Sequence, residues 1–510
     1  MTGPAVAAAL FALTSGAGEG GTPPFDAVTL ETAGRITQRH TADLDGDGLE
    51  DILLLLGRTA RVHFQDPSLG FRAEADLSLE IARDAILFDT GDVDGDPKTR
   101  ELVLLGTDSV SAVSFRGRKA APLGKPLAPA PKSRLRPDAG DVHWRPLARD
   151  LGGTPGDELI LPAERAFAIL ARETTTGAYG DTGRVPLMTT GSVDPGSDAL
   201  LSRFRASVGY PALHVADLDG DGAPDLAAAT LDEIVFFRGS KGGPLVLPGE
   251  WKRFPTGLER RRDRPSPAEP VVLDDADGDG RADLLVVDGP AGTIRVFTSG
   301  ADGPEPEESP AQVLRIDGWI LETSLLDLDG DGRRDLCVAS TPEIGILEGA
   351  RIVLEKSLAF RIDAFPARRE AGGKEPFART PSASVQRFVP VAFATGGPAR
   401  FEMTSAPRPS VLGDFDGDGR PDLFAPIDAG SLGVFRGSAP LRFEEKPSLS
   451  IPLPPGDAAS RGSEAWLRDL NADGRTDIVL LHKSWDRASD RLDVVLSRPA
   501  GRAPRRPERE

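Results

Sequence analysis

The chain has few of the residues on which many enzyme and metal sites depend. Its 510 residues include one cysteine, five histidines and two tyrosines. A single cysteine excludes an intramolecular disulfide and a cysteine-based zinc site. Cys337 stands in the apolar run Leu336-Cys337-Val338-Ala339. We therefore expect a buried core residue there and not a nucleophile.

Positive charge is also scarce. Lys and Arg together number 60 against 79 Asp and Glu, which gives a formal net charge of −19. Because binding of nucleic acid relies on a basic surface, this balance excludes a nucleic-acid partner and favours cations as ligands. Beyond the first 22 residues, no stretch approaches the roughly 18 to 20 consecutive apolar residues of a membrane-spanning helix. We expect no membrane span.

Glycine and proline, in contrast, are abundant. The chain has 57 Gly and 45 Pro, and this composition favours many short strands and turns over long helices. The interpretation at this level is an all-β protein.

The first residues resemble a leader. Residues 5–13 are apolar and Ser15-Gly16-Ala17 offers a small-residue cleavage site, although no Lys or Arg precedes Arg35. Residues 1–22 are thus predicted to be a signal peptide or a disordered leader. The expected location is secreted, periplasmic or at the cell surface.

An acidic segment, Asp-x-Asp-x-Asp-Gly-x-x-Asp, recurs along the chain and is followed each time by an apolar run. Six copies are well formed, with Asn in one place of the last copy. Their candidate ligands are Asp43, Asp45, Asp47 and Asp51; Asp217, Asp219, Asp221 and Asp225; Asp275, Asp277, Asp279 and Asp283; Asp327, Asp329, Asp331 and Asp335; Asp414, Asp416, Asp418 and Asp422; and Asp469, Asn471, Asp473 and Asp477.

Two further copies are degraded. One keeps Asp92, Asp94 and Asp96 but has Pro97 in place of the glycine, and the other, residues 150–158, keeps little beyond its ends. Metal occupancy of both loops stays open. The first residues of successive copies lie 49 (Asp43 to Asp92) to 87 (Asp327 to Asp414) positions apart. Such intervals are typical of one four-stranded propeller blade with variable loops.

The repeat therefore predicts a β-propeller of four-stranded antiparallel sheets over residues 23–498, with eight blades favoured and seven possible. Residues 350–405 hold an insertion, and residues 499–510 are expected to be a disordered tail. Short second strands are expected at residues 234–239, 294–297, 344–349 and 433–437. Residues 26–30 should pair with residues 492–496 and close the ring, which removes the open sheet edges.

The spacing of the carboxylates favours calcium. Carboxylates at positions 1, 3, 5 and 9 converge on one point if the loop curls tightly, and the glycine at position 6 permits that curl. Hard oxygen donors at this density suit Ca²⁺ better than Mg²⁺. The EF-hand is excluded because its position 12 requires Glu, where this chain has Leu54, Ala228, Val286 or Val338. We expect about five to seven structural calcium ions.

These loops resemble the FG-GAP/VCBS repeat family, whose propeller repeats also form the heads of integrin α-subunits. The resemblance spans roughly residues 35–498 and rests on the repeated acidic loops. It implies a β-propeller with Ca²⁺ in the loop between the first two strands of a blade, an extracellular or periplasmic setting, and an adhesion-type role.

Two classes of function remain. The first is a monomeric, non-enzymatic scaffold that binds a protein or glycan, with the loops at residues 119–140, 259–269 and 367–384 as candidate contacts. The alternative is an enzyme similar to polysaccharide lyases on calcium-rich propellers. No histidine stands in a recognisable catalytic motif, but His40 and His214 each precede an acidic loop by three residues and are expected on inner strands. The five tryptophans are expected to be buried between blades and not to serve as sugar platforms.

Overall fold

The computed structural model describes most of the chain. The described residues are 14–15, 25–30, 32, 34–133, 135–152, 155–164, 166–186, 192–193, 206–207, 211–239, 250–258, 270–305, 309–368, 375–395, 401–438, 442–453, 462–483 and 490–497.

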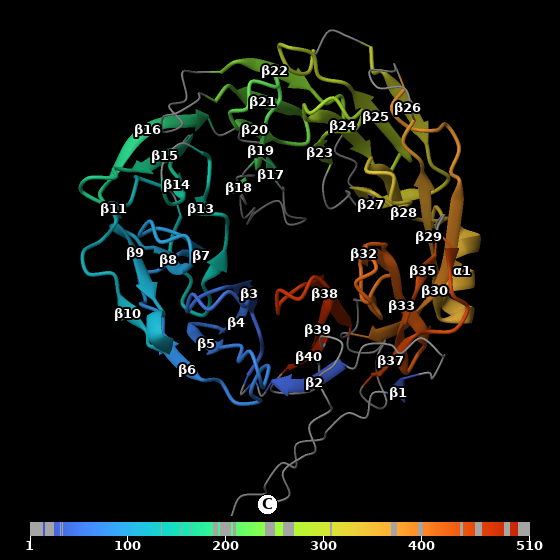
Figure 1. The fold of residues 1–510 in the computed structure, drawn as a ribbon, viewed down its shortest axis with the longest axis horizontal. Helices are drawn as coiled ribbons and strands as arrows, with labels where there is room; N and C mark the ends of the chain where they lie inside the picture. Colours follow the sequence, from blue (N-terminus) through green and yellow to red (C-terminus); the bar gives the residue numbers. More distant parts are fainter. Residues whose placement is uncertain are drawn as a thin grey trace, which may run out of the picture.

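The strands form eight antiparallel blades arranged in a ring around a central axis (Figure 1). From the inner to the outer strand, the first four blades are β3(Gln38–Ala42)-β4(Asp51–Leu56)-β5(Thr59–His63)-β6(Leu77–Glu80); β7(Leu87–Gly91)-β8(Glu101–Leu105)-β9(Ser109–Ser114) with β10(Ala121–Pro122) and β11(Ala128–Pro129); β13(Ala148–Arg149)-β14(Glu158–Pro162)-β15(Ala166–Arg172)-β16(Tyr179–Pro186); and β19(Ala212–Ala216)-β20(Asp225–Ala229)-β21(Glu233–Phe237)-β22(Lys252–Pro255).

The other four blades follow in chain order. They are β23(Val271–Asp274)-β24(Asp283–Asp288)-β25(Thr293–Phe297)-β26(Gln312–Arg315); β27(Trp319–Leu326)-β28(Asp335–Thr341)-β29(Ser357–Phe365)-β30(Ala383–Thr395) with β31(Phe401–Ser405); β32(Ser410–Gly413)-β33(Asp422–Asp428)-β34(Ser431–Phe435)-β37(Leu449–Pro452) with β1(Thr14–Ser15); and β38(Ser463–Arg468)-β39(Asp477–His482)-β40(Arg491–Ser497)-β2(Phe25–Leu30). Two small pairs, β17(Ser192–Val193) with β18(Ala206–Ser207) and β35(Gly437–Ser438) with β36(Arg442–Phe443), lie outside this pattern.

The ring closes as predicted. Strand β2, from the start of the chain, pairs antiparallel with β40, from its end, in the register Phe25↔Ser497 to Leu30↔Leu492. The last blade is thus built from both ends of the chain, and Figure 1 shows β2 beside β40. Because this pairing occupies the outer edge of β40, the unpaired edge that invites aggregation is covered.

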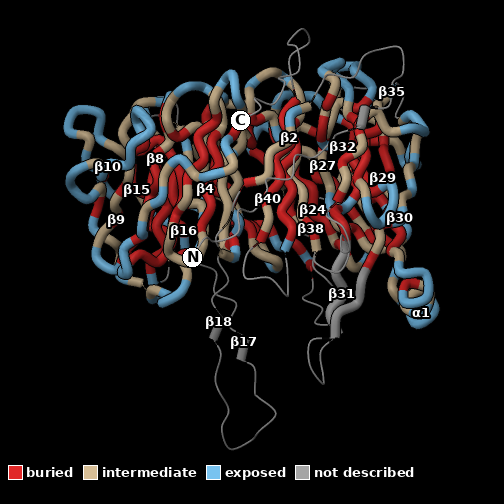
Figure 2. Tube along the Cα trace, turned by 90° about the horizontal axis from the view of Figure 1, so that it is seen from below, coloured by how far each residue is buried: buried red, intermediate tan, exposed pale blue. Residues whose placement is uncertain are grey.

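The second strand of each blade explains the apolar runs that follow the acidic loops. Strands β8, β14 and β20 are buried at every residue. Each blade is packed on both faces by its neighbours, so its central strands read as continuous apolar runs and not as an alternation. Figure 2 shows these buried strands inside the ring and exposed loops at its rims.

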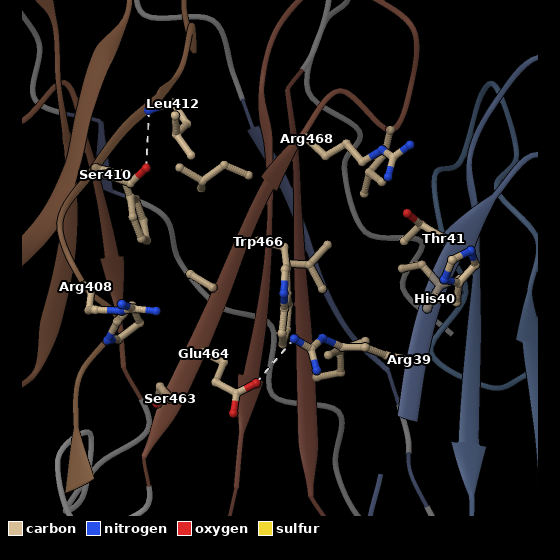
Figure 3. Close-up of a pocket in the computed structure, with 18 of the residues that line it drawn as sticks. Arg39, His40, Thr41, Arg408, Ser410, Leu412, Ser463, Glu464, Trp466 and Arg468 are labelled. Carbon is tan, nitrogen blue, oxygen red and sulfur yellow. Dashed lines mark hydrogen bonds and ion pairs between the residues drawn. The ribbon is translucent and has the colours of Figure 1, made fainter. Parts of the chain in front are cut away.

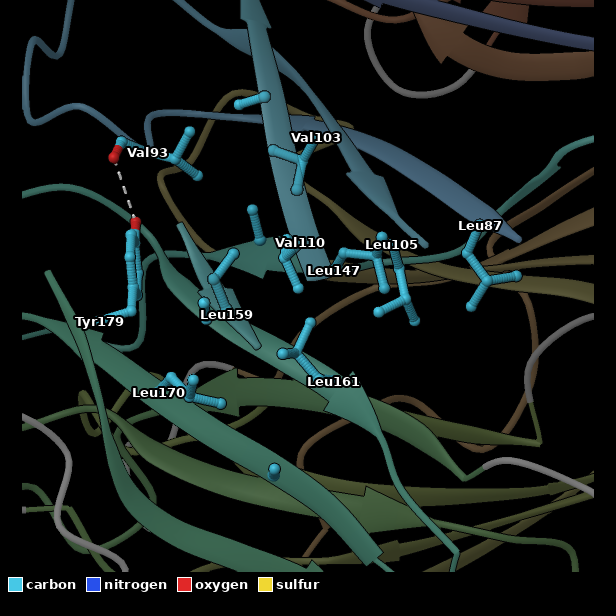
Figure 4. Packing of buried hydrophobic residues seen from close by; sticks show 14 of the residues in the cluster. Leu87, Val93, Val103, Leu105, Val110, Leu147, Leu159, Leu161, Leu170 and Tyr179 are labelled. Atoms are coloured by element: carbon cyan, nitrogen blue, oxygen red, sulfur yellow. Dashed lines mark hydrogen bonds between the residues drawn. The ribbon is translucent and has the colours of Figure 1, made fainter. Parts of the chain in front are cut away.

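Hydrophobic clusters join neighbouring blades. In one of them, Val103 and Leu105 of β8 pack with Leu159 and Leu161 of β14 and with Leu170 of β15 (Figure 4). Such inter-blade clusters follow one another around the ring, so the blades share one continuous core.

The strand predicted at residues 344–349 is wrong. This segment leads into helix α1 (Ile346–Glu355), which connects β28 to β29 and lies on the outside of the ring (Figures 1 and 2). Strand β29 occupies the place beside β28 that the segment was expected to fill. Arg351 pairs with Glu348 and Glu355 at helical spacing, and Ile352 is the buried residue of the helix. Ion pairs one turn apart, which a strand cannot make, favour the helix.

The other three of these predicted strands are confirmed as β21, β25 and β34, which are the third strands of their blades, and within the insertion β30 pairs with β31 in a hairpin. The loop predicted at residues 119–140 contains the short strands β10 and β11 on the edge of β9. Residues 259–269, the leader apart from β1, and the tail 499–510 lie outside the described residues. Among the described helices, none has the length and apolar character needed to cross a membrane.

Candidate metal loops and central pocket

Every acidic loop joins the innermost strand of a blade to its second strand. The loop of residues 43–51, for example, connects β3 to β4. Since the blades are antiparallel and ordered alike, all the loops lie on the same face of the ring. The repeat of the sequence thus becomes a ring of acidic loops in space.

Backbone hydrogen bonds to the first carboxylate hold each loop in its curl. In the fifth blade, Asp275 Oδ1 accepts the N–H of Gly278 at 2.8 Å and Asp275 Oδ2 accepts the N–H of Gly280 at 3.0 Å. These glycines have φ of 80° and 88°, where other residues are strained. The loops that begin at Asp43, Asp217, Asp327 and Asp414 make the same pair of bonds.

The carboxylate at position 9 has a structural role common to all eight blades. Asp283 Oδ2 accepts the N–H of Ala276 at 2.9 Å, and Asp283 Oδ1 accepts the N–H of Ser299 at 2.7 Å, beyond the third strand. We call this arrangement the position-9 clip. The first of its two bonds recurs in every loop, as Leu44 to Asp51, Val93 to Glu101, Leu151 to Glu158, Leu218 to Asp225, Ala276 to Asp283, Leu328 to Asp335, Phe415 to Asp422, and Leu470 to Asp477.

Glu101 and Glu158 were missed as site residues. Sequence reasoning treated the two degraded loops as poor copies, yet both keep a buried carboxylate at the start of the second strand. An acidic residue directly before an apolar strand was the signal that could have identified them. The extra methylene of Glu spans the altered loop and still reaches the same backbone N–H.

Burial makes the clip carboxylates unfavourable as anions. Removal from water raises the pKa of five of them to about 7, and neighbouring loop carboxylates raise it further; these are Asp51, Glu101, Asp283, Asp422 and Asp477. The pKa of Asp225 and of Asp335 is raised for the same reason. A cation in the loop would relieve this penalty.

The remaining carboxylates converge as a cation site requires. One oxygen from each of Asp275, Asp277 and Asp279 lies within 4.8 Å of the others, and the same holds for Asp327, Asp329 and Asp331. Oxygens that bind one Ca²⁺ at about 2.4 Å lie no more than about 4.8 Å apart. Further clusters meet this distance with the help of a clip carboxylate, among them Asp43, Asp45 and Asp51; Asp92, Asp94 and Glu101; and Asp217, Asp219 and Asp225. The donor set therefore fits calcium.

Arginines contact several of the predicted ligands. Arg118 Nε lies 2.7 Å from Asp45 Oδ2, and its Nη2 lies 3.2 Å from Asp47 Oδ2. Arg116 bridges Asp94 and Asp96 of the degraded loop at 2.8 and 2.9 Å. Arginines of two more blades do the same, Arg238 with Asp219 and Arg436 with Asp416. Three of these arginines follow Phe and precede Gly at the end of the third strand, a pattern in Phe115-Arg116-Gly117, Phe237-Arg238-Gly239 and Phe435-Arg436-Gly437.

Hydrogen bonds also connect the loops of neighbouring blades. The N–H of Arg100 donates to the carbonyl of Asp43 at 2.9 Å, and the N–H of Ala282 donates to the carbonyl of Asp217 at 2.8 Å. Asp157 donates in the same way to Asp92, and Thr476 to Asp414. The conformation of one loop is thus coupled to that of the next.

A cavity of about 820 Å³ lies on the channel side of the blades that meet at the closure. Its lining comes mainly from the inner strands β3, β32 and β38 and from Trp144 on β12 (His143–Trp144), a short strand that adds parallel to β7. Figure 3 shows the labelled side chains of this pocket. Because it is formed by strands from both ends of the chain, it exists only in the closed ring.

Arginine and tryptophan are the prominent side chains of the pocket. The Arg39 guanidinium stacks over the Trp466 ring and lies 3.3 Å from Glu464. Burial lowers the pKa of Arg39 to about 10, although Glu464 opposes this shift. The Trp144 indole N–H donates to Asp89 Oδ1 at 2.8 Å, and the His40 ring stacks on Trp144 with 6.0 Å between centroids.

The other sequence predictions have mixed outcomes. His40 and His214 lie on the inner strands β3 and β19, as expected. Cys337 is buried, and burial raises the pKa of its thiol to about 12. The expectation that the tryptophans are buried between blades holds in part. Trp144, Trp251 and Trp466 pack against clusters between blades, but these three and Trp319 are only half-buried, and Trp485 lies outside the described residues.

Comparison with known proteins supports the repeat assignment. A family model for the FG-GAP-like repeat matches residues 275–338 and 414–480, so the chain carries FG-GAP-like repeats in these two regions. These two regions hold the fifth and sixth blades' loops and the loops of the last two blades. None of the curated proteins matches the chain.

Among solved structures, the chain is similar to an Agrocybe aegerita lectin that recognises non-reducing terminal N-acetylglucosamine, at 17% identity and a TM-score of 0.37 over 69% of this chain and 86% of the lectin. It is also similar to the V. cholerae biofilm matrix protein Bap1, at 14% identity and a TM-score of 0.26 over 91% of this chain and 77% of that protein. Likenesses this distant carry no functional conclusion.

Proposed function

We propose that the chain is a calcium-stabilised β-propeller that serves as a non-enzymatic scaffold for binding a protein or glycan outside the cytoplasm. The observation that carries the proposal is the ring of acidic loops, in several of which three carboxylate oxygens of the same loop lie within 4.8 Å of one another. Carboxylates at this spacing repel one another, and Ca²⁺ is the oxygen-seeking cation that suits the donor set.

Calcium would act here as a structural ion. The position-9 clip ties each metal loop to the strands of its blade, and in several blades a backbone bond also ties the loop to the next blade. An ion in one loop would therefore stiffen more than its own blade. A rigid ring lets the variable connections change without loss of the core, and this property suits a binding scaffold.

The test is thermal unfolding in calcium and in EDTA, with metal content measured by mass spectrometry on the same sample. We expect roughly five to seven calcium ions per chain and a marked fall of the melting temperature in EDTA, because an ion that binds only the folded state stabilises it by mass action. Absence of bound metal together with an unchanged melting temperature would refute the calcium role. Sequencing the N-terminus of protein from the native host tests export, which predicts removal of a leader within residues 1–22.

One observation favours a second candidate, the lyase-like enzyme. His40 is the one histidine among the residues that line the pocket, and burial lowers its pKa, which keeps the imidazole neutral as a general base requires. Release of unsaturated sugars from uronic-acid polymers would establish this candidate. A His40→Asn variant of equal activity would exclude His40 as the base.

A further inference from the structure

The central pocket differs in charge from the rest of the molecule. The chain carries a net charge of −19, whereas the pocket is lined by Arg39, Arg408 and Arg468 against Glu322 and Glu464. The local excess is positive. In a low-dielectric cleft this excess attracts an anion from solvent.

The three arginines differ in how far their charge is already neutralised. Arg468 lies 2.6 Å from Glu50, and Arg39 shares Glu464 with Lys483, whose Nζ lies 2.5 Å from the second oxygen. Arg408 is exposed and makes no ion pair within the part of the chain that the structure describes. Its guanidinium therefore offers a planar fork of donors to an incoming carboxylate.

The two indoles of the pocket are held in place. Trp144 is fixed through its N–H to Asp89, which is fully buried and also accepts the N–H groups of Leu147 and Ala148 at 2.8 and 3.1 Å. Trp466 is fixed by the Arg39 guanidinium on one side. In Figure 3 the indole is seen edge-on, with Arg39 on one side of it and Arg408 on the other. Trp466 is half-buried, packs against the hydrophobic cluster between the last and the first blade, and lines the pocket with the rest of its indole.

The remaining lining is suited to hydroxyl groups. Gln38, Thr41, Ser410 and Ser463 add amide and hydroxyl groups to the wall. The volume of about 820 Å³ lies within the range of about 300 to 1,000 Å³ that is typical of small-ligand sites. A ring with several hydroxyls and one carboxylate matches a wall of this kind, whereas an acidic peptide would leave the hydroxyl-binding groups unused.

We propose that the pocket binds a short acidic saccharide of the uronic-acid class, with its carboxylate on Arg408 and a sugar ring against the part of Trp466 that lines the pocket. This inference rests on the proposed binding role and names a ligand class and a site for it. The candidate loops at residues 119–140 and 367–384 are not part of the pocket lining.

The experiment is isothermal titration of the calcium-loaded full chain with a trimer of β-1,4-linked glucuronic acid. The neutral trimer cellotriose, which carries a hydroxymethyl group in place of each carboxylate, and triglutamate serve as comparison ligands. We expect the acidic trimer to bind at least tenfold more tightly than either. The Arg408→Gln variant should lose at least tenfold in affinity for the acidic trimer, since one charge-assisted bidentate contact is removed.

The matched control is Arg315→Gln. Arg315 is also an exposed arginine, but it lies on the outer strand β26, away from the pocket, and its replacement should leave the affinity unchanged. Equal binding of triglutamate, equal loss in both variants, or no binding of the acidic trimer would overturn the proposal. The calcium-dependent melting temperature, measured on the same samples, separates this failure from that of the proposed function. If calcium still raises the melting temperature but no saccharide binds, the proposal of a calcium-stabilised scaffold stands and only the pocket inference fails.

Discussion

Replacing Asp283 by Ala separates the role of the position-9 clip from that of the metal ligands. Asp283 is fully buried, and its two oxygens accept the N–H groups of Ala276 at 2.9 Å and Ser299 at 2.7 Å. Alanine leaves both donors buried without a partner. Each such orphaned donor costs about 1 to 3 kcal/mol.

The net loss of unfolding free energy should be smaller than the sum of the two bonds. Burial raises the pKa of Asp283 to about 7, so the wild-type carboxylate carries a penalty of its own near neutral pH, and alanine removes that penalty. We therefore expect a loss of about 2 to 4 kcal/mol. With an unfolding entropy of about 2.1 cal/mol/K per residue, a chain of 510 residues that unfolds as one unit should melt roughly 2 to 4 °C lower.

The matched variant is Asp279→Ala in the same loop. Asp279 is exposed, its backbone partner is the nearby N–H of Arg281 at 2.9 Å, and its side chain belongs to the converging carboxylates. In EDTA its replacement should change the unfolding free energy by no more than about 0.5 kcal/mol. In calcium it should lower the metal content by one ion per chain.

The assay is differential scanning calorimetry of both variants in EDTA and in calcium, with metal content counted on the same samples. The expected pattern is a loss for Asp283→Ala that is already present in EDTA, and a loss for Asp279→Ala that appears only in calcium. Equal melting temperatures of the two variants in EDTA, or an unchanged melting temperature for Asp283→Ala, would show that the clip does not stabilise the blade as reasoned.

Three further outcomes follow from the same structure. The folded state raises the pKa of the clip carboxyls from about 4 to about 7, so the metal-free protein should lose stability as the pH rises through this window. Its melting temperature in EDTA should therefore be higher near pH 5.5 than near pH 8. The opposite trend would contradict the burial effect. Arg118→Gln should raise the calcium affinity of the first blade, because the guanidinium contacts Asp45 and Asp47 and so competes with the ion. Calcium titration by calorimetry should show a tighter site. A weaker site would mean that Arg118 assists binding. A chain that begins at residue 31 lacks β2 and exposes the edge of β40. Size-exclusion chromatography should then show self-association that the full chain does not show. A stable monomer would mean that ring closure does not protect this edge.

Much of the architecture could be predicted from the sequence because it depends on local chemistry that is repeated. The Asp-Gly loops and the apolar runs after them recur blade after blade, so each copy supports the others. The ring closure could be predicted as well, since residues 26–30 and 492–496 were two expected strands without partners, and they pair. The departure came at α1, where residues 346–355 carry an apolar content that fits a strand and a charge spacing that fits a helix. The place beside β28 is occupied by β29, which follows α1 in the chain. Which of the two segments pairs with β28 cannot be read from a short stretch of sequence.

The candidate site divides in the same way. The spacing of the acidic residues predicts which side chains gather in each loop, since a curl of nine residues is a local event. The sequence does not show that Glu101 and Glu158 complete the clip in the two degraded loops. Whether each carboxylate contacts the backbone N–H of its loop depends on where the second strand places the glutamate. Nor does it show that Arg116 and Arg118 turn back onto carboxylates of two different blades.

The amino-acid sequence alone determined the repeat, the all-β propeller and the oxygen-rich loops, because these follow from periodicity, turn chemistry and charge within a few tens of residues. The tertiary structure decided which distant residues meet. Arg39 and Trp466 are separated by almost the whole chain, and they stack only because ring closure places β3 beside β38. The pocket that they share with Arg408 is a property of the closed ring, since no single blade contains enough of its wall to form it.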